Sequence, residues 1–208
     1  MTCSPEFNFR DFVEKFKDID DSKWGEYMLS KDPLYGKMDE DSKNEIIKSS
    51  IKCAEEEYEK ISQQINTKGL QEYIENEGIN VVYEDEVLQS IYTYLSLYIP
   101  KNKTIIISNY TIDLIKEEIE KEEIGDIINA DKLIDITIAH ELFHHIEEKS
   151  EKIYTREKNM RYLMFGKIKR EACAAAASEI AAVYFSKLVI GITYCPSVFE
   201  IIAGQVYK

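Results

Sequence analysis

The chain has 208 residues and a formal net charge of −13, with 26 Lys and Arg against 39 Asp and Glu. This length allows a sizeable core to be buried without disulfide bonds, so we expect a single domain over residues 1–208. The acidic balance argues against direct binding of nucleic acid, because like charges would repel the phosphate backbone.

Targeting and membrane signals are not evident in the sequence. The N-terminus lacks a basic start followed by an apolar run, and no stretch is long and apolar enough to cross a bilayer. The four cysteines are too few and too widely spaced for a disulfide scaffold or a Cys-x-x-Cys metal site. We therefore expect a cytoplasmic protein that does not bind membranes.

The first half of the chain predicts helices followed by strands. Residues 1–41 mix short amphipathic runs with turn signals and indicate an irregular helical cap. Residues 42–45 (Ser-Lys-Asn-Glu) match a capping box, so a helix is expected to begin at Ser42 and to continue, with apolar residues at steps of four and three, to about Ile65. A shorter helix is expected over about 70–76.

Beyond Gly78 the pattern changes to short β-branched runs. Residues 79–83, 92–99 and 104–108 predict three strands, and the polar turn at 100–103 predicts that the last two form a hairpin. Residues 111–122 are then expected to be helical.

The second half predicts two apolar helices. Asp131 can cap a helix that runs to about Ile146 and has few polar positions around its circumference, which places it in the core. A charged connector over 147–159 and the segment 160–165 lead to an Ala-rich helix over about 170–189. The fold class predicted is α+β, mainly helical, with a sheet of about three strands packed near the helix that carries residues 140–144.

The segment His140-Glu141-Leu142-Phe143-His144 matches the pattern H-E-x-x-H. Residues four apart lie on one face of a helix, so His140 and His144 can hold one ion. Zinc accepts two imidazoles and a third protein ligand, and in catalytic sites it keeps a position open for water. Glu141 would reach that water as general base. His145 lies about 100° further round the helix and is interpreted as a structural or supporting ring.

The third ligand is sought on another helix. The metzincin pattern requires Gly at 147 and His at 150, whereas this chain has Glu147 and Ser150, which excludes that class. A glutamate from a second helix is the remaining common arrangement, and the Ala-rich segment offers Glu171 and Glu179. Glu179 is preferred because small and apolar neighbours surround it and would let the two helices approach closely.

At these residues the chain resembles the gluzincin metallopeptidases, and more narrowly the ImmA/IrrE type. The resemblance rests on A-H-E-L-F-H at 139–144 and on residues 179–188, which are similar to that family's E-x-x-A-x-x-F-A helix; it covers about 42–190. It implies a zincin-like fold, zinc bound by His140, His144 and Glu179, and Glu141 as general base. It also implies an intracellular peptidase that cleaves a regulatory protein such as a transcriptional repressor.

Two further expectations follow from this resemblance. Zincin substrates lie extended beside an edge strand, which here would be 104–108 or its hairpin partner. A side chain that polarises the scissile carbonyl could be any of four, and the sequence does not choose among them: Tyr154, Arg161, Tyr162 and Tyr184. The alternatives to a peptidase are a non-catalytic zinc-binding regulatory or interaction module and a zinc hydrolase for a small amide or ester.

Overall fold

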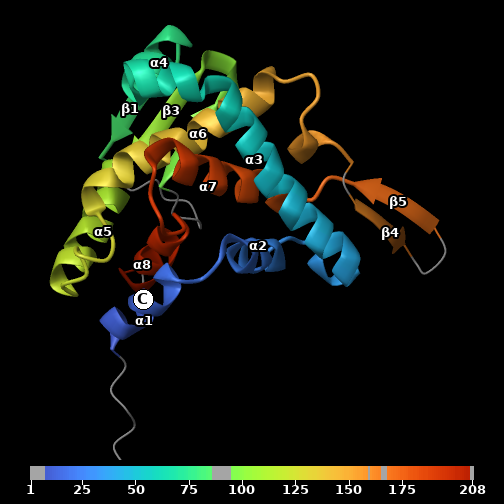
Figure 1. Cartoon of the computed structure of the whole chain (residues 1–208), viewed down its shortest axis with the longest axis horizontal. Coiled ribbons are helices and arrows are strands. Elements are labelled where there is room, and N and C mark those ends of the chain that lie inside the picture. The colour runs from blue at the N-terminus through green and yellow to red at the C-terminus, as the bar shows by residue number, and fades with distance from the viewer. Residues whose placement is uncertain (1–7, 86–94, 159, 165–167, 207–208) are drawn as a thin grey trace, which may run out of the picture.

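The computed structural model describes residues 8–85, 95–158, 160–164 and 168–206. Its helices (Figure 1) are α1 (Phe9–Lys17), α2 (Asp21–Ser30), α3 (Glu40–Lys68), α4 (Leu70–Asn76), α5 (Asn109–Lys121), α6 (Leu133–Lys149), α7 (Ala175–Ile190) and α8 (Val198–Val206). Its strands are β1 (Asn80–Glu84), β2 (Ser96–Ile99), β3 (Thr104–Ser108), β4 (Met160–Met164) and β5 (Ile168–Ala172). The fold is mainly helical with a small mixed sheet, which confirms the α+β class.

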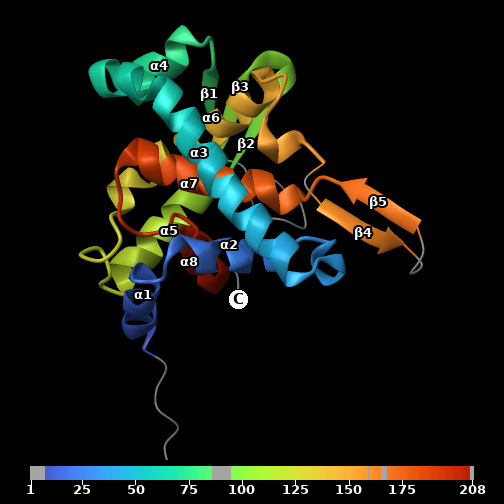
Figure 2. The ribbon, with the colours of Figure 1, turned by 45° about the vertical axis from the view of Figure 1, so that its right-hand side comes forward.

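The three-stranded sheet has the order β1-β3-β2. The hairpin of β2 and β3 is antiparallel, as predicted, whereas β1 pairs with β3 in parallel. Ile105 and Ile107 of β3 are fully buried, and β2 packs against α6. Figure 2 shows the three strands gathered beside α6, so the prediction that the sheet lies near this helix is confirmed. Residues 92–94 of the expected second strand lie outside the described residues.

The core of the molecule is built around α7, which packs most extensively against α3 and α6. Ala177 and Ala181 of α7 are fully buried, and such small side chains let neighbouring helix backbones approach closely. Phe143 of α6 and Phe185 of α7 are also fully buried, with ring centroids 5.5 Å apart. The close packing of α6 and α7 is what brings residues distant in the sequence into one site.

Helix starts differ from those predicted because other side chains supply the caps. Asp39 accepts a hydrogen bond from the backbone amide of Ser42 at 2.8 Å, so α3 begins at Glu40 and the expected capping box at 42–45 is wrong. Asp131 does not cap α6: it lies in a 3-10 turn before that helix, and its own amide donates to the Asn129 side chain at 2.9 Å.

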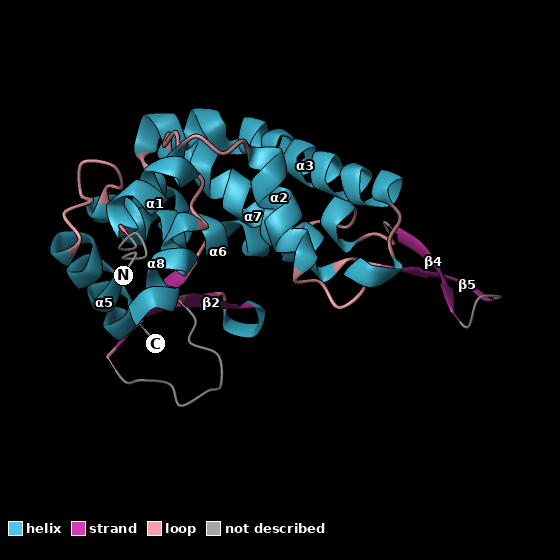
Figure 3. Cartoon of the chain, turned by 90° about the horizontal axis from the view of Figure 1, so that it is seen from below, coloured by secondary structure: helices cyan, strands magenta, loops and turns pink. Residues whose placement is uncertain are grey.

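The segment between α6 and α7 was predicted least well. The helix α6 continues to Lys149, so residues 147–149 are not part of a connector. Strands β4 and β5 form an antiparallel hairpin that projects from the helices (Figures 1 and 3), and α7 begins at Ala175, not near 170. Lys169, Arg170 and Glu171 are good helix formers, but pairing with β4 overrides that weak preference.

The expected N-terminal cap is helical from Phe9 onward, through α1 and α2. Arg10 of α1 forms a bidentate ion pair with Asp126, at 2.6 and 2.9 Å, which ties α1 to the loop after α5. Residues 1–7 lie outside the described residues. Within the described ranges, none of the helices combines the length and apolar character that crossing a bilayer requires.

A close contact between α2 and α3 gives a prediction about stability. A Cβ at Gly25 would lie 2.6 Å from Cγ2 of Ile47, a β-branched side chain with little freedom to move in a helix. We expect Gly25→Ala to destabilise the protein by about 1–3 kcal/mol, although Ala is otherwise preferred to Gly in a helix. Urea unfolding measures this, with Gly36→Ala as control because a Cβ there meets nothing within 4 Å. Equal effects of the two substitutions would contradict the contact.

Candidate metal centre

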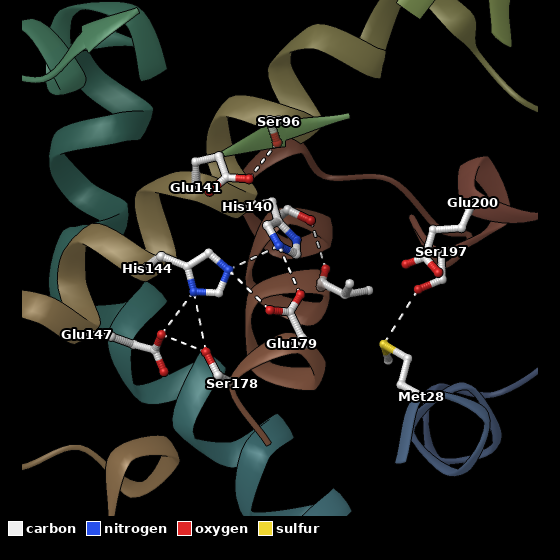
Figure 4. A network of polar contacts seen from close by, with 12 residues as sticks. Met28, Ser96, His140, Glu141, His144, Glu147, Ser178, Glu179, Ser197 and Glu200 are labelled. Atoms are coloured by element: carbon white, nitrogen blue, oxygen red, sulfur yellow. Dashed lines mark hydrogen bonds and ion pairs between the residues drawn. The ribbon is translucent and has the colours of Figure 1, made fainter. Parts of the chain in front are cut away.

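Two histidines of α6 face one another across a short gap. His140 and His144 lie one turn apart, and their Nε2 atoms are 3.2 Å from each other (Figure 4). Their side chains are 22% and 21% exposed, so both rings are mostly buried. This arrangement is the one that the H-E-x-x-H spacing predicts.

The third group comes from α7. Glu179 Oε2 lies 3.4 Å from His140 Nε2, and Glu179 Oε1 lies 3.7 Å from His144 Nε2. His140, His144 and Glu179 form a group of side chains that can hold a metal ion. Glu171, the other candidate, is not on α7 at all: it lies on β5 in the projecting hairpin. The assumption that both glutamates share one helix is therefore wrong, and the geometry favours Glu179.

The spacing of these atoms suits a tetrahedral ion. Ligand atoms that lie about 2.0–2.1 Å from a tetrahedral zinc ion are separated from one another by about 3.3 Å. The two Nε2 atoms here are 3.2 Å apart, and they lie 3.4 and 3.7 Å from different oxygens of the Glu179 carboxylate, so small rotations of the side chains would bring one atom of each residue into coordination distance. The donor set, two imidazoles and one carboxylate, is also one that zinc binds.

The charges in the site are strongly coupled. Burial by itself would lower the pKa of His140, but the hydrogen bond and negative charge of Glu179 outweigh it and raise the pKa to about 9. Burial correspondingly favours the neutral form of Glu179, yet its contacts with His140 and the charge of His144 bring its pKa down to about 2. The carboxylate thus favours a positive charge at this position, which a bound cation would also supply.

Glu141 is held beside this group by a strand of the sheet. Its side chain is buried, and its Oε1 accepts a hydrogen bond from Ser96 Oγ at 2.5 Å (Figure 4). Ser96 is the first residue of β2. Sequence reasoning missed Ser96, because nothing in the local pattern signals a contact between residues 45 positions apart.

Glu147 is a second residue that the sequence analysis did not place in the site. It was assigned to a charged connector, but it lies on α6 and is only 3% exposed. Its carboxylate is hydrogen-bonded to His144, Ser178 and Thr155. Although burial raises the pKa of Glu147, these three hydrogen bonds outweigh it and lower the pKa. Its spacing of three from His144 is the signal that could have found it.

His145 belongs to a different set of contacts. It is 1% exposed, its Nδ1 lies 2.6 Å from the Tyr98 hydroxyl, and its Nε2 lies 3.4 Å from Glu77. Burial lowers the pKa of His145 and favours the neutral ring. These contacts join α6 to β2 and to the residue after α4, in agreement with the structural role that the sequence suggested.

A cavity of about 540 Å³ opens beside the candidate metal ligands. This volume is in the range of roughly 300–1,000 Å³ that is common for ligand pockets. Its walls come from β2, α5, α6, α7 and α8, and they are mainly apolar. Residues that line it besides His140, Glu141 and Glu179 include Ile115, Ile136, Thr137, Val183, Phe199 and Glu200.

Of the four side chains considered for polarising a carbonyl, the two that the structure describes are not found at this cavity. Neither Tyr154 nor Tyr184 lines it, and the Tyr184 hydroxyl instead donates to Glu55 of α3. The side chains of Arg161 and Tyr162 lie outside the part of the chain whose side chains the structure describes. Among the described residues that line the cavity, none is a tyrosine, lysine or arginine.

No protein-family model, curated protein or solved structure matches this chain. The case for a function therefore rests on the residues and geometry described above.

Proposed function

We propose that this protein is a zinc-dependent peptidase. The observation that carries the proposal is the convergence of His140, His144 and Glu179 at spacings suited to one tetrahedral ion, with the Glu141 carboxylate on the adjacent turn of α6. Two imidazoles and one carboxylate are a ligand set found in hydrolytic zinc sites. Such sites also have a base that can take a proton from the metal-bound water, and Glu141 would fill this role.

The charge balance around the site supports a bound cation. Glu141, Glu147 and Glu179 surround the two histidines, and Glu200 lies on the cavity wall. Of the described residues that line the cavity, none carries a permanent positive charge. A divalent ion would compensate this excess of carboxylates more fully than a protonated histidine can.

The chain's own residues supply positioning and proton transfer. A zinc ion, when bound, acts as a Lewis acid and promotes ionisation of water. Glu141 would accept a proton from the attacking water and deliver it to the leaving amine. Ser96 fixes one oxygen of that carboxylate by its hydrogen bond at 2.5 Å, which leaves the other oxygen for the proton transfer.

The cavity and the sheet support a peptide as substrate. Among the described strands, β3 is paired on both sides and its hairpin partner β2 on one side only, so β2 is the strand whose edge a substrate strand would pair with. This edge begins at Ser96, next to Glu141, and the mainly apolar cavity beside it suits a large apolar side chain. A regulatory protein such as a transcriptional repressor is the substrate that the resemblance suggests.

One observation favours the alternative of a zinc-binding module without turnover. The described lining of the cavity contains no tyrosine, lysine or arginine to stabilise a developing oxyanion, and the Thr137 hydroxyl already donates to the Leu133 carbonyl at 2.8 Å. Such a module would bind the same ion and the same peptide segment without cleaving it. Incubation of the zinc-loaded protein with unfolded proteins and candidate repressors, with and without a chelator, separates the two: chelator-sensitive cleavage supports the peptidase, and binding without cleavage supports the module.

Metal binding is expected to stabilise the fold. Since the ligands come from α6 and α7, an ion that bridges them binds the folded state only, and at 100 times its dissociation constant it adds about 2.7 kcal/mol to the free energy of unfolding. We expect one zinc ion per chain by elemental analysis and a thermal midpoint that falls when a chelator removes it. A midpoint that does not respond to zinc or chelator would contradict the metal site.

A further inference from the structure

Glu147 is a buried carboxylate without an ordinary counter-charge. Its side chain is 4% exposed, and among the described residues no lysine or arginine forms an ion pair with it. An isolated buried carboxylate is costly, and such groups are normally paired with a cation or coupled to a metal. The only ionisable partner described for it is the ring of His144, one turn earlier on α6.

The two nitrogens of that ring face different groups. Nδ1 of His144 lies 2.9 Å from Glu147 Oε2, whereas Nε2 faces His140 and Glu179 (Figure 4). A carboxylate accepts hydrogen bonds and does not donate them, so the contact requires the proton to be on Nδ1. The lone pair of the neutral ring is then on Nε2, which points to the candidate metal position.

Two neutral donors hold the Glu147 carboxylate in this position. Ser178 of α7 donates to Oε2 at 2.7 Å, and the hydroxyl of Thr155 donates to Oε1. Ser178 is the residue immediately before Glu179, so the same turn of α7 provides both a candidate metal ligand and a support for Glu147. Both carboxylate oxygens of Glu147 thus accept hydrogen bonds, and Oε2 is the one that faces Nδ1 of His144.

We infer that Glu147 is a positioning residue for the metal site: it fixes the ring orientation and the Nδ1–H tautomer of His144, and thereby raises the affinity of Nε2 for the ion. This inference rests on the proposed metal site. Carboxylates that accept from a ligating histidine typically contribute about 10–100-fold to metal affinity. A charged carboxylate also increases the electron donation of the ring and compensates part of the charge of the ion.

The substitution Glu147→Gln tests this inference. Glutamine preserves the size of the side chain but removes the charge, and its amide can donate to Nδ1 and so favour the tautomer with the proton on Nε2. We expect zinc affinity, measured by competition with a chromophoric chelator, to fall by about 10–100-fold. The matched control is Glu148→Gln on the same helix, because Glu148 is exposed and pairs with Arg156; its affinity should equal that of the wild type.

Two further readouts distinguish positioning from a purely structural role. The thermal midpoint of the metal-free protein reports the fold alone, and the visible spectrum of the cobalt-substituted protein reports the ligand field. We expect the cobalt spectrum to change in Glu147→Gln and not in Glu148→Gln. A variant with wild-type zinc affinity, or one whose loss of affinity is matched entirely by loss of apo-protein stability, would overturn the inference.

A measurement on the unmodified protein covers the case in which Glu147→Gln does not fold. The chain contains only three histidines, so nitrogen NMR of the zinc-loaded protein can resolve each ring. We expect His144 to carry its proton on Nδ1, and a proton on Nε2 would overturn the inference. Failure of the wild-type protein to bind zinc would instead refute the proposed function itself, so the two failures are distinguishable.

Discussion

Replacing Glu141 with glutamine is expected to leave zinc bound and to reduce peptide cleavage by about 10²–10⁴-fold, the usual contribution of general acid–base catalysis. Glutamine has nearly the shape of glutamate, and its carbonyl oxygen can still accept the hydrogen bond from Ser96. It cannot accept a proton, so only the chemical step is lost. The measurement is the initial rate of cleavage of a protein substrate, with zinc content determined on the same sample.

The control for this variant is again Glu148→Gln, which changes an exposed carboxylate of α6 to an amide without touching the cavity. It should cleave at the wild-type rate. If Glu141→Gln also cleaved at that rate with zinc in place, Glu141 would have no part in the chemistry. If it lost zinc together with activity, the substitution would have damaged the metal site, and the base would have to be sought elsewhere.

The central residues of the candidate site could be predicted because their positions depend mainly on the sequence close to them. The distance between His140 and His144 is set by the pitch of a helix, and a helix was predictable from the apolar residues around them. Glu179 was predictable in a weaker sense, from the small residues near it that allow two helices to come close. These inferences needed no knowledge of how the chain folds back on itself.

Residues that support the site were not predictable in the same way. Ser96 reaches Glu141 only because β2 packs against α6, which is a tertiary contact. Glu147 was missed for another reason: a run of charged residues indicated a solvated connector, and the pattern does not show that one of them is buried against α7. Burial of a single charge depends on partners such as Thr155 and Ser178, which come from other segments.

The Ala-rich helix was predicted to begin too early, which shows how local helix preference competes with strand pairing. Lys169, Arg170 and Glu171 favour a helix, and alanines follow them closely, so local preference predicts one continuous helix. The structure instead ends a strand at Ala172 and begins α7 at Ala175. This boundary bears on the proposed third ligand, because it places Glu171 and Glu179 on different elements.

Comparison of Glu179→Ala with Glu171→Ala therefore tests fold and site together. Removing Glu179 deletes one of the three proposed ligands, so zinc affinity should fall by more than the roughly 10–100-fold expected for a supporting carboxylate. Glu171 lies on β5 in the projecting hairpin, so its removal should leave zinc affinity and cleavage unchanged. Equilibrium competition with a chelator measures both.

The metal-free forms of the two variants separate loss of a ligand from loss of the fold. The Glu179 side chain is 56% exposed and contacts the two histidines, so alanine at this position removes little packing. Its main effect without metal should be to lower the pKa of His140, because the contact that raises it is gone. Wild-type zinc affinity in Glu179→Ala, or a greater loss in Glu171→Ala, would mean that the ion is not held between α6 and α7, and the proposed peptidase chemistry would lose its basis.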